Sequence, residues 1–320
     1  MNKQIKSYIT ALLLLFFVVG CTTEESVNVI QITASIGMKG QPFDTEERLY
    51  QLGDTLVYKF EVTSPNGIEK IEFSNYTGVG ANKAAPVVLS KIENLEGTTW
   101  TLVDTIKNIQ DDVRYSVYVQ DKNRNYKSHQ VNAFLDISRY LSISLFDGLS
   151  NGTSKTFINT ESARTFYIAN TIGDPTAMDF GFAFMENKSN VLACLVSFDN
   201  YWMTGAYPSI VNNLNRPMQF KKSTQANINN VSVIKSRVKS AADLKSIFEQ
   251  ATFFNSVLPL LPDEKCAYNI KSRDVIAFKT FDGRYGLMQV TLVDAKSNSI
   301  ANTQKITFAM FVEKNKTFLD

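Results

Sequence analysis

The residues best suited to bind a small molecule lie between positions 198 and 207. This stretch reads Phe-Asp-Asn-Tyr-Trp-Met-Thr-Gly-Ala-Tyr. An aromatic ring can stack on the apolar face of a sugar, while an amide and a carboxylate bond its hydroxyl groups. The alternative is that the rings are buried at a domain edge or under a loop, as large aromatic side chains mostly are. The ligand-binding residues predicted on the first interpretation are Asp199, Asn200, Tyr201, Trp202 and Tyr207.

Catalytic patterns are scarce. The chain has one histidine, His129, so most serine- or cysteine-based hydrolase schemes lack a general base unless His129 itself serves. No G-x-S-x-G, Walker loop, dinucleotide fingerprint or H-E-x-x-H occurs. Asp179 could act as a general acid, but no partner carboxylate lies close to it in sequence, so a hydrogen-bonded or surface aspartate is the preferred interpretation. We predict a protein that is not an enzyme and uses no cofactor.

One segment begins like a calcium-binding loop, with Asp121, Asn123 and Asn125 at alternate positions. The sixth and twelfth positions of such a loop require glycine and glutamate, and here they hold Tyr126 and Asn132. A hairpin turn is the better interpretation, and we predict no metal site.

The cysteines leave a question open. Cys194 lies in an apolar, strand-like run, and Cys266 follows a polar segment. They could pair as a disulfide after export, or be two unrelated thiols, and the sequence supports both readings. Two cysteines with a histidine far away in the chain do not make a zinc site.

The N-terminus predicts export and lipid anchoring. Lys3 and Lys6 precede an apolar run at positions 9–19 that is too short to span a bilayer and matches a signal peptide. The run ends Val-Val-Gly-Cys, which resembles the lipobox of bacterial lipoproteins. The resemblance implies a signal peptide over residues 1–20, a lipidated Cys21 and a linker over residues 21–27. Glu24 and Glu25 resemble the surface-export signal of Bacteroidota lipoproteins, which implies a lipid-anchored outer-membrane protein that faces outward.

Composition limits the partners. Removal of the two signal-peptide lysines leaves 31 basic and 31 acidic residues, so the mature chain is formally neutral. Nucleic-acid binding requires an excess of positive charge, and we therefore expect none. The basic stretch between positions 221 and 239 is interpreted as a solvated face. A chain of 320 residues that is 44% hydrophobic can bury two domain cores.

Residues 28–138 predict an immunoglobulin-like β-sandwich. Short stretches alternate apolar and polar side chains between turns, as half-buried strands do. The pattern Tyr115-x-Val117-x-Val119-x-Asp121, followed by Asn125, resembles the last hairpin of bacterial immunoglobulin-like modules. Such modules are usually spacers or binding platforms. Trp100 is expected in the core of this sandwich.

Residues 139–320 predict a mainly-β ligand-binding or partner-binding domain with one or two short helices. Positions 178–184 alternate large apolar with small or polar side chains, and Asp282-Gly283 is a tight-hairpin signal. Ser240 and Asp243 have the spacing of a helix capping box. The expected fold class of the whole chain is therefore mainly β.

Taken together, the chain resembles accessory lipoproteins of Bacteroidota nutrient-uptake systems. The resemblance implies a non-catalytic protein, held to the membrane by its lipid, that binds a glycan or peptide at the cell surface. A second hypothesis is an adhesin or complex subunit that docks a protein partner through an exposed apolar patch. A third is a glycan hydrolase, which requires two carboxyl groups facing each other across a cleft.

Overall fold

The computed structural model describes residues 29–41, 43, 49–77, 87–147, 155–167, 178–187, 190–199, 216–225, 228, 230–254, 264–294 and 304–315. Over these residues the protein is mainly β with two short helices, so the predicted fold class is confirmed. None of the helices in this part of the chain is long and apolar enough to cross a membrane.

The chain forms two compact units. The first comprises residues Met1–Glu46, Thr55–Lys107 and Asp112–Ala133. The second comprises residues Glu47–Asp54, Asn108–Asp111 and Phe134–Asp320. Two short segments that lie between strands of the first unit in sequence therefore belong to the second.

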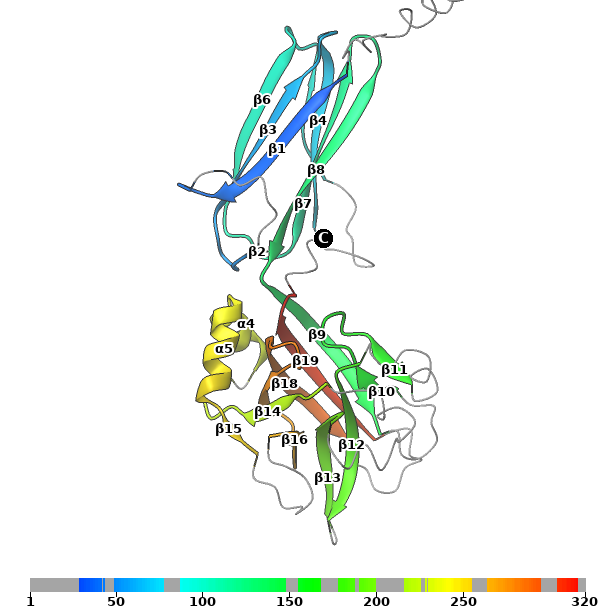
Figure 1. Cartoon of the computed structure of the whole chain (residues 1–320), viewed down its shortest axis with the longest axis vertical. Coiled ribbons are helices and arrows are strands. Elements are labelled where there is room, and N and C mark those ends of the chain that lie inside the picture. Colours follow the sequence, from blue (N-terminus) through cyan, green and yellow to red (C-terminus); the bar gives the residue numbers. More distant parts are fainter. Residues whose placement is uncertain are drawn as a thin grey trace, which may run out of the picture. The chain divides into compact units, whose positions relative to one another are not determined.

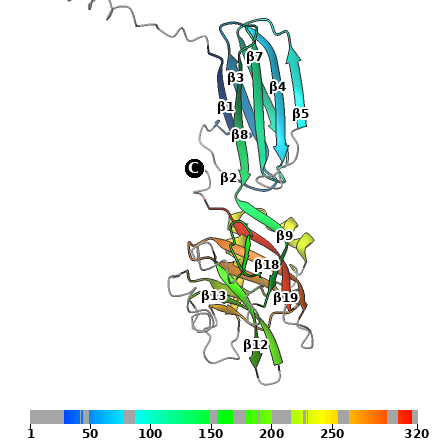
Figure 2. The ribbon, with the colours of Figure 1, turned by 90° about the vertical axis from the view of Figure 1, so that its right-hand side faces the viewer.

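The strands of the first unit form two antiparallel sheets (Figures 1 and 2). The three-stranded sheet has the order β1 (Gln31–Met38), β3 (Leu56–Thr63), β6 (Thr99–Ile106). The other sheet has the order β8 (Tyr126–Leu135), β7 (Val113–Asp121), β4 (Ile68–Thr77), β5 (Val87–Glu93). A two-residue strand, β2 (Leu49–Tyr50), runs parallel to the last two residues of β8.

Aromatic rings fill the space between the two sheets. Tyr58 of β3 stacks on Phe73 of β4 and on Tyr115 of β7, with ring centroids 4.9 and 4.8 Å apart. These contacts join the inner faces of the sheets, which makes the unit a β-sandwich. The expectation that Trp100 lies in this core was wrong. It is half-buried on the edge strand β6, and the buried tyrosines and phenylalanines occupy the centre instead.

Asp121 organises the turn between β7 and β8. Its Oδ1 accepts hydrogen bonds from the backbone amides of Asn123 and Asn125, at 2.9 and 2.8 Å. Its Oδ2 accepts bonds from the side-chain amides of Asn66 and Asn125. Burial alone would raise the pKa of this carboxyl, but these bonds to its charged form outweigh burial and lower it. The hairpin-turn interpretation is confirmed.

The second unit contains two larger sheets. The first has the order β11 (Thr165–Tyr167), β10 (Lys155–Ile158), β12 (Phe180–Asn187), β13 (Asn190–Ser197), β16 (Cys266–Ala267). The second has the order β15 (Thr252–Phe253), β14 (Gln219–Lys222), β17 (Val275–Lys279), β18 (Tyr285–Asp294), β19 (Lys305–Glu313), β9 (Ile137–Phe146). The ring of Phe180 meets Phe220 edge-on and also contacts Phe278, so the two sheets pack face to face.

Helices cover the far face of the six-stranded sheet. They are α4 (Val231–Arg237) and α5 (Ala241–Gln250), which the ribbon shows beside this sheet (Figure 1). Along β17, Ile276 and Phe278 pack towards the other sheet, whereas Val275 and Ala277 pack with the helices. Both faces are buried because the strand is apolar on both of its sides. The predicted capping box is present, with Ser240 as the N-cap of α5.

Gly286 lets the phenyl ring of Phe278 lie directly against the backbone of β18. It lies opposite Phe278 in the strand register, and the phenyl ring covers it. A Cβ atom at position 286 would lie only 2.0 Å from Cζ of Phe278. Only glycine therefore fits beneath this ring.

Candidate functional site

Most of the predicted ligand-binding residues lie outside the described residues. This applies to Asn200, Tyr201, Trp202 and Tyr207, and also to the predicted lipidation site Cys21. Asp199 is described, at one end of the stretch, and Arg216 is described at the other. The geometry of the candidate site is therefore the geometry of these two flanks.

The first flank is fixed through Asp199. Its Oδ1 accepts a hydrogen bond from the hydroxyl of Ser197, and its Oδ2 forms an ion pair with Lys265. The Ser197 hydroxyl in turn accepts a hydrogen bond of 2.8 Å from the backbone amide of Met218. The carboxylate of Asp199 is 13% exposed and both of its oxygens have partners, so its present role is to join three segments of the chain.

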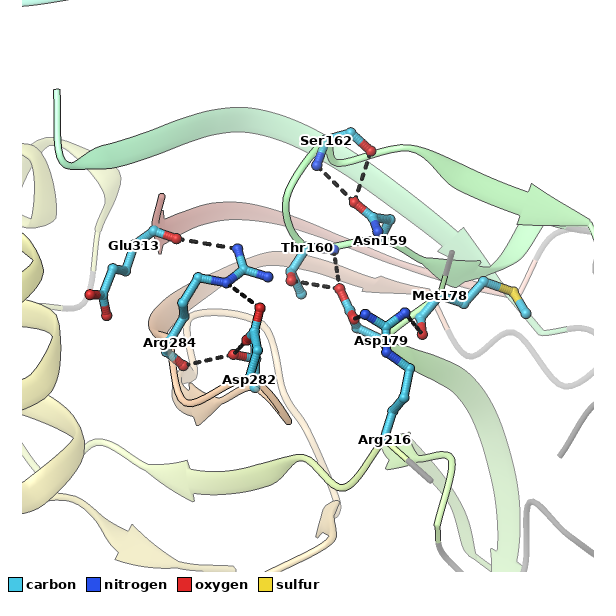
Figure 3. A network of polar contacts seen from close by, with 10 residues as sticks. Asn159, Thr160, Ser162, Met178, Asp179, Arg216, Asp282, Arg284 and Glu313 are labelled. Carbon is cyan, nitrogen blue, oxygen red and sulfur yellow. Dashed lines mark hydrogen bonds and ion pairs between the residues drawn. The ribbon is translucent and has the colours of Figure 1, made fainter. Parts of the chain in front are cut away.

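The second flank is fixed through Asp179 and Arg216 (Figure 3). Asp179 is fully buried, and its Oδ2 accepts hydrogen bonds of 2.6 Å from both the amide and the hydroxyl of Thr160. Its Oδ1 lies 3.3 Å from the guanidinium of Arg216. Arg216 also donates a bond of 3.1 Å to the backbone oxygen of Met178. A buried carboxylate requires such compensation, because unpaired charge in a protein interior is strongly unfavourable.

Arg216 also touches the tip of the β17–β18 hairpin. The centre of its guanidinium group lies 3.8 Å from the centroid of the Phe281 ring, and that ring is 40% exposed. Next to it, Asp282 accepts hydrogen bonds from the hydroxyl of Thr280 and from Nε of Arg284, the latter at 2.8 Å (Figure 3). Nη1 of Arg284 also donates a hydrogen bond to the backbone oxygen of Glu313. These hydrogen bonds fix the conformation of the hairpin tip, where the ring of Phe281 remains partly exposed.

Both flanks lie at the same end of one strand ladder. Phe180, the first residue of β12, is the register partner of Ser197, the last residue of β13. Asp179 precedes this pair and Asp199 follows it. Since Arg216 contacts Asp179 and Met218 contacts Ser197, the chain leaves this end at residue 199 and returns to it at residue 216. A segment whose two ends are fixed close together on a rigid sheet is a common framework for a binding loop.

The charged side chains of these two flanks hold chain segments in place. Each carboxylate faces a cation, Asp179 with Arg216 and Asp199 with Lys265. Among the residues that the structure describes, no group of three or more histidine, cysteine, aspartate or glutamate side chains could hold a metal ion. The arrangement supplies rigid attachment points and does not present an unpaired acid and base.

The two cysteines are free thiols in this structure, and both are buried. They lie on the neighbouring strands β13 and β16, where Cys266 is the register partner of Val196, two residues from Cys194. Burial raises the pKa of the Cys266 thiol, and the neighbouring Cys194 raises it further. The geometry places the two thiols side by side without a disulfide bond between them.

Sequence reasoning missed the partners of both anchors. Thr160, Arg216 and Lys265 are separated from their carboxylates by 19 residues or more, so no local pattern identified them. Phe281 follows a strand end and carried no signal beyond its place beside the Asp-Gly turn. The one usable hint was that Asp199 adjoins the aromatic stretch.

Comparisons with known proteins add little. No protein-family profile matches the sequence, and no curated protein matches it. Among solved structures, the chain is similar to the crystal structure of a DUF4466 family protein from Parabacteroides merdae. The two sequences are 12% identical, the match covers 89% of this chain and 99% of the other, and the TM-score is 0.37. A similarity of this size supports no inference about the fold or function of this chain.

Proposed function

We propose that this protein is a non-catalytic lipoprotein of a Bacteroidota outer membrane that binds a glycan or peptide at the cell surface. The signal peptide, the lipobox and the acidic pair after Cys21 support the location. The aromatic and amide side chains between positions 199 and 207 favour a glycan as the ligand. Trp202 is the residue of this stretch on which we place most weight.

One observation carries the proposal. The segment that holds Tyr201, Trp202 and Tyr207 leaves and re-enters one end of the β12–β13 ladder through two anchored residues, Asp199 and Arg216. Binding residues are commonly placed on loops that a rigid scaffold positions. The carboxylates nearest this stretch, Asp179 and Asp199, are already paired with Arg216 and Lys265. This pairing favours a ligand-binding role for the stretch over acid–base catalysis.

The first test is a glycan-array screen of the mature, detergent-extracted protein. We expect binding to one family of glycans, and its loss in Trp202→Ala with the melting temperature unchanged. Trp100→Ala is a matched control, because Trp100 is the other tryptophan of the chain and lies in the first unit. Equal binding by wild type and Trp202→Ala would contradict the proposed site.

The anchor is tested separately. In Cys21→Ser the lipid attachment site is lost, so the protein is expected to carry no label when cells are fed a labelled fatty acid, whereas the wild type is labelled. Protease treatment of intact cells distinguishes the outward-facing protein from one that faces the periplasm. Fatty-acid label in Cys21→Ser, or none in the wild type, would contradict the lipoprotein assignment.

A protein-docking role has one observation in its favour. Strand β5 lies at the edge of its sheet, and its first three residues, Val87, Val88 and Leu89, are 58%, 52% and 46% exposed. Exposed apolar edge strands can pair with another chain. If Val88→Lys abolished capture of a partner by the intact protein while glycan binding was absent, this second function would replace the first.

A further inference from the structure

The outer face of the five-stranded sheet in the first unit carries a stacked row of three side chains. Tyr118 of β7 stacks on Tyr126 of β8, with ring centroids 6.1 Å apart and an angle of 21° between the planes. The ammonium group of Lys70, on β4, lies 5.4 Å from the centroid of the Tyr118 ring. The row therefore crosses three neighbouring strands.

The row points away from the core of the sandwich. Tyr118 lies between Val117 and Val119, which are both fully buried, and successive side chains of a strand alternate between its two faces. Tyr118 is half-buried, whereas Tyr126 is 74% exposed, the highest exposure among the large apolar and aromatic side chains that the structure describes. An aromatic ring this exposed contributes little to the core of the unit.

Tyr126 stands at an open edge. Among the described strands, β7 pairs with β8 over residues 126–133, and β2 pairs with β8 only at residues 134 and 135. One side of the Tyr126 ring is supported by Tyr118, and Lys70 supports Tyr118 in turn. The ring is therefore held in one orientation with a free face, so a ligand that stacks on it would pay a smaller cost in side-chain entropy.

The surroundings of Tyr126 can bond hydroxyl groups. Gln120 is its register partner on β7, and Ser128 and Gln130 follow at alternate positions of β8, with exposed side chains. An amide both donates and accepts hydrogen bonds, and a serine hydroxyl does the same. A ring flanked by such groups suits a ligand that has one apolar face and a rim of hydroxyls.

Four charges on this face beside Tyr118 form two ion pairs. Lys70 forms an ion pair of 2.9 Å with Glu72, and Lys91 forms one with Glu93 on the adjacent strand β5. These four charges cancel, whereas Arg114, further along the same face of β7, donates a hydrogen bond to the neutral side chain of Asn132. The balanced charge beside Tyr118 favours a neutral ligand there over an anionic one.

We propose that the outer face of this sheet is a glycan-binding platform for neutral polysaccharide, on which a sugar ring stacks against Tyr126. Gln120, Ser128 and Gln130 bond the sugar hydroxyls. Tyr118 is a positioning residue that holds the Tyr126 ring. This inference rests on the proposed glycan-binding function and adds a second contact surface, on the first unit, to the predicted one at residues 199–207.

The test is affinity electrophoresis of the mature chain in native gels that contain one polysaccharide each: the neutral polymers laminarin, galactomannan, xyloglucan, mannan or pullulan, or the anionic polymer heparin. We expect at least one gel to retard the wild type. Tyr126→Ala should weaken that binding roughly three- to tenfold, the equivalent of one lost aromatic contact. Tyr126→Phe keeps the ring and should stay within about twofold of wild type. Tyr118→Ala should weaken binding by less than Tyr126→Ala does.

Tyr167→Ala is the matched control, because Tyr167 is also an exposed tyrosine, 38% exposed, with a lysine ammonium group 5.5 Å from its ring centroid, but it lies in the second unit. Retardation that Tyr126→Ala leaves unchanged would overturn the inference, and so would retardation in heparin gels alone or in none of the gels. Loss in Trp202→Ala without loss in Tyr126→Ala overturns it while leaving the proposed function standing. Loss in Tyr126→Ala without loss in Trp202→Ala establishes the platform and removes the predicted site in the second unit.

Discussion

Asp179 and Arg216 form an ion pair 3.3 Å long, although 37 residues separate them in the chain and the carboxylate has no exposed surface. The pair joins the start of β12 to the segment that leads into β14. Because Thr160 donates two hydrogen bonds to the same carboxylate, the anchor also includes the segment after β10.

Removing the charge of Asp179 should therefore weaken the fold. We expect Asp179→Asn to lower the free energy of unfolding by about 3 kcal/mol, because it leaves Arg216 partly buried without its counter-ion. Urea denaturation followed by circular dichroism measures this. The control is Glu249→Gln, which breaks the exposed pair between Lys245 and Glu249 and should cost less than about 0.5 kcal/mol. Equal losses in the free energy of unfolding would show that the buried ion pair stabilises the fold no more than the exposed pair does.

Asp136 predicts a dependence of stability on pH. Burial raises its pKa to about 6, and Glu313 and Asp243 add to the rise, while a hydrogen bond of 2.9 Å from the amide of Ala241 opposes it. The folded protein thus binds the proton more tightly than the unfolded chain, in which the pKa is near 3.8. The contribution of Asp136 is largest below about pH 4 and is lost as the pH rises through about 6.

Asp136→Asn should remove this dependence. Its melting temperature should exceed that of wild type at pH 8 and match it at pH 4, since asparagine imitates the protonated acid and its oxygen can still accept from Ala241. Differential scanning calorimetry between pH 4 and pH 8 gives the comparison, with Glu96→Gln, an exposed carboxylate, as control. A constant difference across this range would mean that Asp136 titrates elsewhere.

Gly286→Ala should be severely destabilising. The new methyl group would overlap the ring of Phe278, which must then leave a fully buried position, and overpacking of this kind costs about 3 kcal/mol. Combining it with Phe278→Leu should cost less than the sum of the two single substitutions, because the smaller side chain makes room. Thermal unfolding of all four proteins completes the cycle, and strict additivity would argue against the clash.

The two thiols should not react with alkylating reagents until the protein unfolds. Cys194 and Cys266 are fully buried, and the thiolate is the reactive form, so the raised pKa of Cys266 slows alkylation further. We expect a maleimide to label neither residue in the native mature protein and both in 6 M guanidinium without a reductant. If labelling in guanidinium required prior reduction, the two cysteines would be joined in the isolated protein. A third labelled thiol would mean that Cys21 carries no lipid.

Local sequence patterns predicted the features that depend on neighbours in the chain. Alternation identified β3, β7 and β12, because a strand that buries one face repeats every two residues. The turns at Asp121 and at Asp282-Gly283 were also recognisable, since a side chain or a glycine there sets the backbone. The capping box of α5 was visible for the same reason: all its hydrogen bonds are made within four residues.

Features that depend on distant partners could not be predicted. No residue near Asp179 in the sequence indicates that Arg216 forms an ion pair with it. The requirement for glycine at position 286 is likewise visible only in the structure, where Phe278 covers it. The misplacement of Trp100 has a related cause. The alternation of side chains around Trp100 predicts a strand but not that this strand, β6, lies at the edge of its sheet, where Trp100 is only partly buried. Strand order is a property of the assembled sheet.

The position of β19 has a consequence for biosynthesis. This strand lies between β18 and β9, although β9 begins at Ile137 and β19 at Lys305. The strand β9 therefore has no partner in its sheet until the ribosome has synthesised β19, whereas every sheet of the first unit is complete by Leu135. Until then β9 stays unpaired in the second unit, and a chain that stopped before β19 would leave that strand exposed to proteolysis.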